Sequence, residues 1–208
     1  MTTTRVKICG ITCLEDALAA CDAGADALGF VLAPEAKKRN RYIEPAAAFE
    51  IIAELPPFVT TVAVCVNESI QQLANYLTHF DCVQCCGDET PSDLPPAQVT
   101  LKAFRAGPDF DVQRMLYYEA RGYVLDAAVQ GEHGGTGQTC DWEVARAAVA
   151  TGKPIVLAGG LTPENVAEAV REVRPFAVDT SSGVESAPGK KDHDRIRAFV
   201  HNAKAPLA

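Results

Sequence analysis

Short apolar runs alternate with amphipathic stretches along this whole chain. The apolar runs read as continuous rather than alternating, which is typical of parallel strands buried on both faces. We predict eight strands, at Val6–Cys9, Ala27–Val31, Thr61–Val66, Cys82–Cys85, Thr100–Phe104, Tyr123–Asp126, Ile155–Ala158 and Ala177–Asp179. Helical spacing of apolar residues fills the segments between these strands. It predicts helices at Leu14–Ala23, Pro45–Leu55, Ile70–Phe80, Val112–Ala120, Trp142–Ala150, Pro163–Val173 and Asp192–Ala203, with a weak one at Pro91–Leu94.

Eight strand–helix units in 208 residues fit an α/β fold, a compact (β/α)₈ TIM barrel, with residues 1–208 as a single domain. The competing fold is a doubly wound open sheet. That sheet usually carries a glycine-rich fingerprint after its first strand, which Cys9-Gly10-Ile11-Thr12-Cys13 lacks. In a barrel the carboxyl ends of all strands face one mouth, where active sites are built.

Composition narrows the class of protein. The net charge is −8, which argues against a nucleic-acid or anionic membrane partner. No apolar run approaches the roughly 20 residues of a membrane span, and Met1–Arg5 leads directly into a strand. We therefore expect a cytoplasmic protein. Its cysteines, expected mostly as reduced core residues, lie at positions 9, 13, 21, 65, 82, 85, 86 and 140. The single CxxC pair, Cys82 and Cys85, has no second pair to complete a metal site, so no metal is expected.

Two residues at predicted strand ends suit proton transfer. Cys9 ends the first strand, and a thiolate acts as a base where positive charge stabilises it. Asp126 ends the sixth strand, where burial would favour the protonated form that a general acid needs. An acid and a base facing each other across a substrate suit an isomerase. The plain alternatives are a packed cysteine and a capping carboxylate.

The turns after the last two strands suit a phosphate group. Gly159 and Gly160 follow strand seven, and Ser181-Ser182-Gly183 follow strand eight, the usual phosphate corner of barrel enzymes. Glycine allows close backbone approach, and serine adds hydroxyl donors. Ordinary tight turns are the alternative. An acidic protein must bind phosphate through such local N–H groups, and the sequence predicts a small phosphorylated substrate.

Two loops add further candidates. The basic segment Lys37–Tyr42 is either a solvated loop or a site where Arg41 grips a substrate carboxylate. The segment Glu132–Gln138 has the glycines of a loop that folds over a ligand, but no Gly-Lys-Ser/Thr of a nucleotide P-loop. Its His133 is a weaker candidate for a second proton carrier.

Motifs around the strand ends carry a family resemblance. They are Val6–Thr12, Gly29–Val31, Arg41–Ile43, Val64–Asn67, Gly87–Glu89, Leu125–Asp126, Gly134–Gly137 with Asp141–Trp142, Leu157–Leu161 with Pro163–Val166, and Val178–Asp192. In order and spacing the chain resembles the phosphoribosylanthranilate isomerases of tryptophan biosynthesis along essentially its whole length.

This resemblance implies a cofactor-free Amadori rearrangement of N-(5-phosphoribosyl)anthranilate to 1-(2-carboxyphenylamino)-1-deoxyribulose 5-phosphate. By position, Asp126 corresponds to the general acid that protonates the ribose ring oxygen, and Cys9 to the base that removes the C2 proton. Arg41 corresponds to the residue that binds the anthranilate carboxylate, and Asp179 to a polar residue near the sugar. The phosphate would bind at Gly159, Gly160, Ser181, Ser182 and Gly183. A monomer or a homodimer is expected.

The chain departs from the family pattern at two places. It reads Gln84-Cys85-Cys86-Gly87 where the family usually has Gln-Leu-His-Gly, so Cys86 replaces a histidine beside the pocket. It reads Arg39-Asn40-Arg41-Tyr42 for the family's Ser-Pro-Arg-Tyr. Both changes are expected to shift substrate affinity, and Cys86 also the pH profile.

Two alternatives compete with this isomerase. The first is another phosphate-binding barrel enzyme, such as a sugar-phosphate isomerase or indole-glycerol-phosphate synthase. The synthase is expected to bring a catalytic Lys/Glu set and a longer N-terminal helix. A non-catalytic binder of phosphorylated metabolites is expected to have lost Cys9 or Asp126, and both residues are present.

Overall fold

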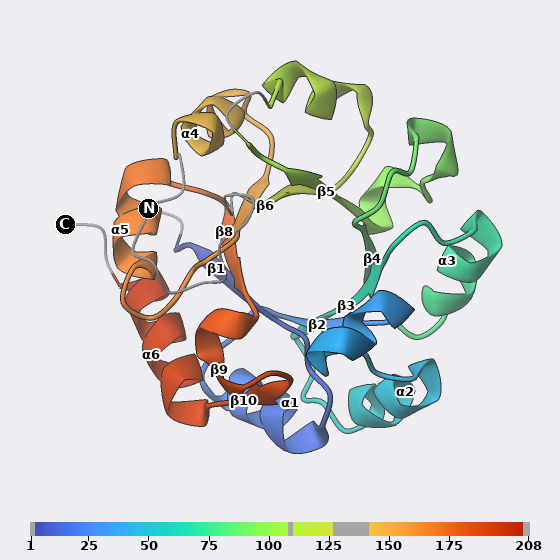
Figure 1. Cartoon of the computed structure of the whole chain (residues 1–208), viewed down its shortest axis with the longest axis vertical. Coiled ribbons are helices and arrows are strands. Elements are labelled where there is room, and N and C mark those ends of the chain that lie inside the picture. The colour runs from blue at the N-terminus through green and yellow to red at the C-terminus, as the bar shows by residue number, and fades with distance from the viewer. Residues whose placement is uncertain (1–2, 108–109, 127–141, 206–208) are drawn as a thin grey trace.

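Eight parallel strands close into a barrel in chain order (Figure 1). The structure is a computed structural model that describes residues 3–107, 110–126 and 142–205. The barrel strands are β1 (Arg5–Cys9), β2 (Ala27–Val31), β3 (Thr60–Cys65), β4 (Cys82–Cys85), β5 (Thr100–Arg105), β6 (Gly122–Asp126), β7 (Ile155–Ala158) and β8 (Ala177–Thr180). The predicted (β/α)₈ barrel is therefore confirmed, and the open sheet is excluded. The single-domain boundary of 1–208 stays a prediction.

Helices surround the barrel on the outside (Figure 1). They are α1 (Leu14–Asp22), α2 (Pro45–Ala53), α3 (Ile70–Tyr76), α4 (Trp142–Ala150), α5 (Val166–Val173) and α6 (His193–Lys204). Short 3₁₀ segments are η1 (Pro34–Arg39), η2 (Pro91–Asp93), η3 (Ala97–Val99), η4 (Val112–Tyr117) and η5 (Ser182–Val184). The helices predicted at 91–94 and 112–120 are thus wrong in type. The first of these segments begins at Pro91 and is followed by Pro95 and Pro96, and these prolines lack the N–H donors that a longer helix needs.

Helix α5 begins three residues later than its start signal at Thr162-Pro163 predicts. The side chain of Asn165 explains the delay. Its Oδ1 accepts the N–H of Thr162 at 2.8 Å, and its Nδ2 donates to the carbonyl of Gly160 at 3.0 Å. These bonds close a turn ahead of the helix. The same turn fixes the loop that follows β7.

An antiparallel hairpin that the sequence analysis did not predict lies between β8 and α6. Its strands are β9 (Glu185–Ala187) and β10 (Lys190–Lys191), and Figure 1 shows them beside α1. At its turn Gly189 has φ +79°, and a Cβ there would lie 1.9 Å from the carbonyl oxygen of Asn40. Only glycine allows this close approach. The hairpin is thereby pressed against the segment that leads to Arg41.

Apolar side chains fill both sides of the barrel wall. Residues such as Ile8 and Leu157 pack between strands and helices, in the largest buried cluster. Cys9 belongs to a separate cluster with Val62, Val64 and Cys82, which face the barrel interior. The two cysteines of the CxxC pair lie in different clusters, Cys82 inside and Cys85 outside, because residues three apart on a strand point to opposite faces.

A buried ion pair on the outer side of the barrel wall links Lys102 on β5 to Glu89, in the segment after β4. Lys102 donates from Nζ to Glu89 Oε2 at 2.7 Å, and both side chains are at most 3% exposed. The other carboxylate oxygen of Glu89 accepts the backbone N–H groups of Asn67 and Gly87. Burial alone would raise the pKa of Glu89, but the hydrogen bonds from Lys102 and Asn67 hold it below its usual value.

Glu89→Gln is expected to lower the free energy of unfolding at pH 7 by about 3–5 kcal/mol, because it leaves a buried ammonium without its counter-ion. Because the pKa of Glu89 is lowered in the folded protein, this stabilisation is present above the ordinary carboxyl pKa and is lost as the pH falls through the lowered pKa. Urea unfolding of both proteins at several pH values measures the difference. Equal stability at pH 7 would show that the pair contributes nothing.

Candidate active site

Cys9 and Lys7 converge inside the mouth of the barrel. They alternate along β1 and so share the face that points inward. Gly29 on β2 lies opposite Cys9 in the register. A Cβ at Gly29 would lie 2.8 Å from the Sγ of Cys9 and 3.0 Å from the Nζ of Lys7. The absence of a side chain at Gly29 therefore makes room for both groups.

Lys7 forms a buried ion pair with Asp179 on β8. Its Nζ lies 2.9 Å from Asp179 Oδ2, and the two side chains are 4% and 8% exposed. Burial would lower the pKa of Lys7, but Asp179 and Cys9 outweigh it and raise this pKa above its usual value. The second oxygen of Asp179 is buried and has no hydrogen-bond partner among the described residues. It is an acceptor suited to a polar group of a bound molecule.

Asp126 lies at the end of β6, as predicted, but it is exposed. The expectation that burial favours its protonated form is therefore wrong. The residue is the last of its strand, where the barrel wall meets the mouth. The negative charge of Asp126 acts on Asp179, so the two carboxyl groups face the same region. The structure thus places an exposed carboxyl group at the same mouth as Cys9.

The loops after β7 and β8 lie directly against each other. Gly159 and Gly160 have φ +92° and +64°, which favour glycine. Thr180 donates from Oγ1 to the carbonyl of Leu161 at 2.8 Å, and a Cβ at Gly183 would lie only 1.9 Å from that same carbonyl oxygen. Ser181 and Ser182 lie between these two contacts in the chain. The residues predicted to hold a phosphate are therefore brought together.

The side chain of Arg41 lies at the mouth, where its guanidinium forms an ion pair with Glu185. Its Nε and Nη2 donate to the two oxygens of Glu185 at 2.9 and 2.7 Å. A Cβ at Gly10 would lie 2.9 Å from Ser181 Oγ and 3.3 Å from the Arg41 side chain. Arg41 is therefore beside the loop after β1, held in one orientation by a carboxylate of this chain. These two bonds use one N–H of Nε and one of Nη2, and the guanidinium has further N–H donors besides them.

The side chain of Lys191 forms hydrogen bonds to the end of β1, to the loop after β8 and to Glu185. Its Nζ donates to the carbonyl of Cys9 at 2.6 Å, to the carbonyl of Ser181 at 3.1 Å and to Glu185 at 3.0 Å. Burial would raise the pKa of Glu185, but hydrogen bonds from Arg41 and Lys191 hold it below its usual value. The end of β1, the loop after β8 and Arg41 are thus one connected network.

The sequence patterns indicated no role for Lys7, Glu185 or Lys191. A signal was present for Lys7, since a charged residue two positions before Cys9 must share its inward face. Glu185 and Lys191 lie in the unpredicted hairpin, and their spacing carried no comparable pattern.

Cys86, the replacement for the expected histidine, follows β4 and is half-buried. The Nε2 of Gln84 lies 3.3 Å from its Sγ. Burial raises the pKa of Cys86 to about 11, so this thiol is neutral near pH 7. A histidine there would change charge in the physiological range, and Cys86 does not. The predicted loop at 132–138, with His133, lies outside the described residues.

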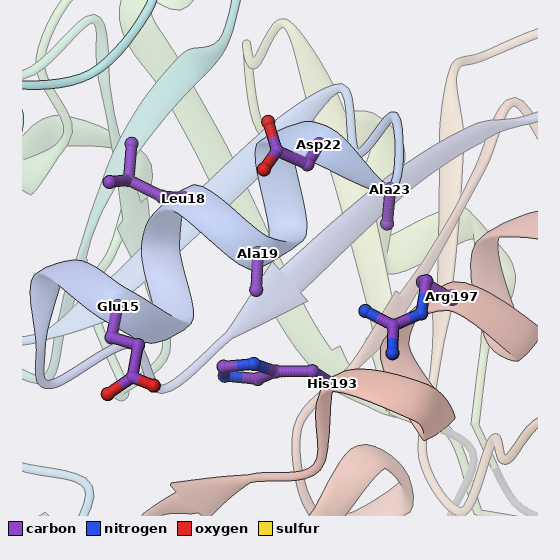
Figure 2. Close-up of a pocket in the computed structure, with 7 residues that line it drawn as sticks. All are labelled: Glu15, Leu18, Ala19, Asp22, Ala23, His193 and Arg197. Carbon is purple, nitrogen blue, oxygen red and sulfur yellow. The ribbon is translucent and has the colours of Figure 1, made fainter.

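The groove in Figure 2 lies between α1 and α6, on the outer wall of the barrel. None of the predicted site residues lines it. Its His193 is bonded to Asp16 at 2.8 Å. Across the described residues, no group of three or more His, Cys, Asp or Glu side chains is placed to hold a metal ion. Within those same residues, every helix is too short or too polar to cross a bilayer.

Comparison with known proteins gives consistent matches over almost the whole chain. Residues 6–202 match the family described as N-(5'phosphoribosyl)anthranilate (PRA) isomerase. The N-(5'-phosphoribosyl)anthranilate isomerase of Trichlorobacter lovleyi is 50% identical over 207 residues, covering 98% of this chain and 99% of the relative. The phosphoribosyl anthranilate isomerase structure from Thermotoga maritima has a TM-score of 0.86 at 44% identity, covering 98% and 100% of the two chains. A structure of a phosphoribosyl anthranilate isomerase in complex with reduced 1-(o-carboxyphenylamino)-1-deoxyribulose 5-phosphate has a TM-score of 0.81 at 42% identity, covering 98% of this chain and 100% of that chain.

Gly183→Ala is expected to weaken binding of inorganic phosphate roughly tenfold, because the new Cβ forces the loop after β8 away from Leu161. Calorimetric titration with phosphate measures this loss. Gly152→Ala is the matched control, since Gly152 has φ +76° but no atom within 4 Å of its Cβ position and lies at the other end of β7. Unchanged phosphate affinity in Gly183→Ala would remove this cradle from the site.

Proposed function

The chain belongs to the N-(5'-phosphoribosyl)anthranilate isomerase family, and from that premise we propose which of its residues carry out the reaction. The enzyme is an aldose–ketose type isomerase of tryptophan biosynthesis. It converts N-(5-phosphoribosyl)anthranilate to 1-(2-carboxyphenylamino)-1-deoxyribulose 5-phosphate. The observation that carries our assignment is the placement of Cys9, beside the buried Lys7, at the same mouth as Asp126.

Asp126 is the general acid of this proposal. Its exposed carboxyl group protonates the ring oxygen of the ribose, and the ring opens to a Schiff base between C1 and the anthranilate nitrogen. That proton remains on the sugar as the new hydroxyl group. Exposure at the mouth allows the carboxylate to be reprotonated from solvent.

Cys9 is the general base. Its thiolate removes the proton from C2, which gives an enolamine with a double bond between C1 and C2. The enolamine becomes the product when C1 takes up the proton held by Cys9, which restores the thiolate, and the C2 hydroxyl releases its own proton to solvent. The proton released to solvent balances the one that Asp126 takes from it. Asp126 gives the substrate one proton and Cys9 takes one from it. No step transfers a hydride or an electron to another molecule, so we propose catalysis without a cofactor.

The remaining residues orient the substrate between these two groups. The turns at Gly159, Gly160 and 181–183 hold the phosphate, and the unpartnered oxygen of Asp179 accepts a sugar hydroxyl. Arg41 binds the anthranilate carboxylate through the N–H groups that Glu185 does not use.

Local charge supports an anionic substrate. Around Cys9 lie the cations Lys7, Arg41 and Lys191, against the two carboxylates Asp179 and Glu185. The chain as a whole carries a net charge of −8. Asp126 adds a third carboxyl group at the mouth, so three cations and three carboxyl groups balance there inside an acidic protein. The mouth is therefore less negative than the chain as a whole, which favours a substrate with a phosphate and a carboxylate.

Cys9→Ala and Asp126→Asn are each expected to lower kcat/KM by about 10²- to 10⁴-fold, because each removes one proton-transfer group. The fluorescence decay of substrate generated in situ measures turnover. Cys13→Ala is the matched control, an exposed cysteine four positions along, and is expected to stay fully active. A fully active Cys9→Ala or Asp126→Asn would overturn that residue's role. A folded wild type without turnover would favour the non-catalytic binder.

We also propose a cytoplasmic location and a monomer or homodimer as the assembly. The location follows from the biosynthetic role of the family. Light scattering on the purified protein distinguishes the two assemblies by mass.

A further inference from the structure

Lys7 is a buried charged group to which the reaction steps above give no part. Its Nζ is directed to Asp179 at 2.9 Å, and its side chain is 4% exposed. We propose that Lys7 is a positioning residue for Cys9, whose thiolate it holds in place beside the C2 proton of the substrate. This inference rests on the proposed role of Cys9 as the base.

The geometry places the ammonium and the thiol side by side. One point, the Cβ position of Gly29, lies within 3.0 Å of both Lys7 Nζ and Cys9 Sγ. No side chain can lie between them there, because Gly29 has none. The ammonium also acts on Cys9 by charge and by hydrogen bonding. Lys7 therefore bridges Cys9 and Asp179.

Asp179 is what allows Lys7 to remain charged inside the barrel. An isolated buried ammonium would lose its proton, but the partner carboxylate stabilises the charged form. When Cys9 is a thiolate, the ammonium faces two anions. When Cys9 has taken the C2 proton, Asp179 remains as the counter-ion. In this proposal Lys7 remains the counter-ion of Asp179 while Cys9 takes up and releases the proton.

Other charged groups also face Cys9, and their contacts differ from those of Lys7. Arg41, from the loop after β2, and Lys191, from β10, both act on the thiol by charge. Both are bonded to Glu185, and Lys191 reaches the Cys9 carbonyl rather than its sulfur.

Three further titratable groups complete the surroundings. Cys82, on β4, lies in the same cluster as Cys9, and burial raises its pKa to about 11. Cys86, after β4, is neutral near pH 7, because burial raises its pKa to about 11. Asp126, at the end of β6, acts on Asp179. Lys7 is therefore the cation of this set that the structure places beside both the sulfur of Cys9 and an inward carboxylate.

Three variants test the proposal. Lys7→Met removes the charge and keeps the length, while Lys7→Arg keeps a positive charge. Because Lys7→Met leaves Asp179 buried without a partner, the double variant Lys7→Met/Asp179→Asn removes both charges and protects folding. Lys102→Met is the matched control, since Lys102 is an equally buried lysine paired with Glu89 on the outer side of the wall.

The readout is the rate at which iodoacetamide alkylates Cys9 at pH 7, followed for each cysteine by peptide mass spectrometry. Alkylation of the exposed Cys13 in the same molecules is the internal reference. In Lys7→Met and in the double variant, the alkylation rate of Cys9 relative to that of Cys13 is expected to fall at least about tenfold, because the thiolate loses the neighbouring ammonium. Lys7→Arg is expected to restore part of the rate, and Lys102→Met to leave the ratio unchanged. An equal ratio in the double variant and in wild type overturns the proposal.

Isomerase assays on the same proteins separate this inference from the proposed function. The acid limb of the kcat/KM profile is expected to move to higher pH in the double variant and not in Lys102→Met. Alkylation requires no turnover. If the wild type is active and the Lys7 variants leave the alkylation rate of Cys9 unchanged, the inference about Lys7 is overturned and the proposed function is not. An inactive wild type whose Cys9 alkylation depends on Lys7 overturns the proposed function and leaves the contact between Lys7 and the thiolate supported.

Discussion

The pairing of β1 with β8 is the constraint on which the rest of the structure depends. It joins the first and last strands of the barrel and sets Lys7 directly beside Asp179, 172 positions away in the chain. Lys191, following in the hairpin after β8, bonds the carbonyl of Cys9. Without this closure Cys9 and the loop at 181–183 would share no site. A barrel has no open edge, so the closing register is fixed at the same time as the fold.

Burying these charges is costly unless every one is compensated. Lys7 is matched by Asp179, and Glu185 is shared by Arg41 and Lys191. The sharing gives Glu185 two roles, since it satisfies a buried ammonium and fixes the guanidinium of Arg41. The three cations Lys7, Arg41 and Lys191 lie at the mouth, where the substrate presents its phosphate and carboxylate. Stability and substrate selection thus depend on the same few bonds.

The strands were predictable because their apolar runs are short and sharply bounded. Residues 27–31 and 155–158 form strands with the predicted limits. The hairpin at 185–191 was missed because it is polar and its strands are very short. The start of α5 was misplaced because Asn165 folds its side chain back onto Thr162 and Gly160, which a helix signal at Thr162 does not reveal.

The candidate site was predictable from strand ends, and its internal pairing was not. Cys9, Arg41, Asp126 and the two phosphate turns follow from where strands stop in a barrel. Arg41 and Glu185 are 144 positions apart in the sequence, and no local sequence pattern predicts the hydrogen bonds between them. The exposure of Asp126 was also missed, since an apolar strand before it suggests burial. Such pairings depend on barrel closure, which local sequence periodicity does not encode.

The most direct test is a crystal structure of this protein with reduced 1-(o-carboxyphenylamino)-1-deoxyribulose 5-phosphate. We expect the phosphate to lie against the turns at 159–160 and 181–183, and the carboxylate to bind Arg41. The sugar carbons should lie between Cys9 Sγ and Asp126, with a hydroxyl on the second oxygen of Asp179. A ligand bound in the outer groove of Figure 2, or one with C2 beyond reach of Cys9, would contradict it.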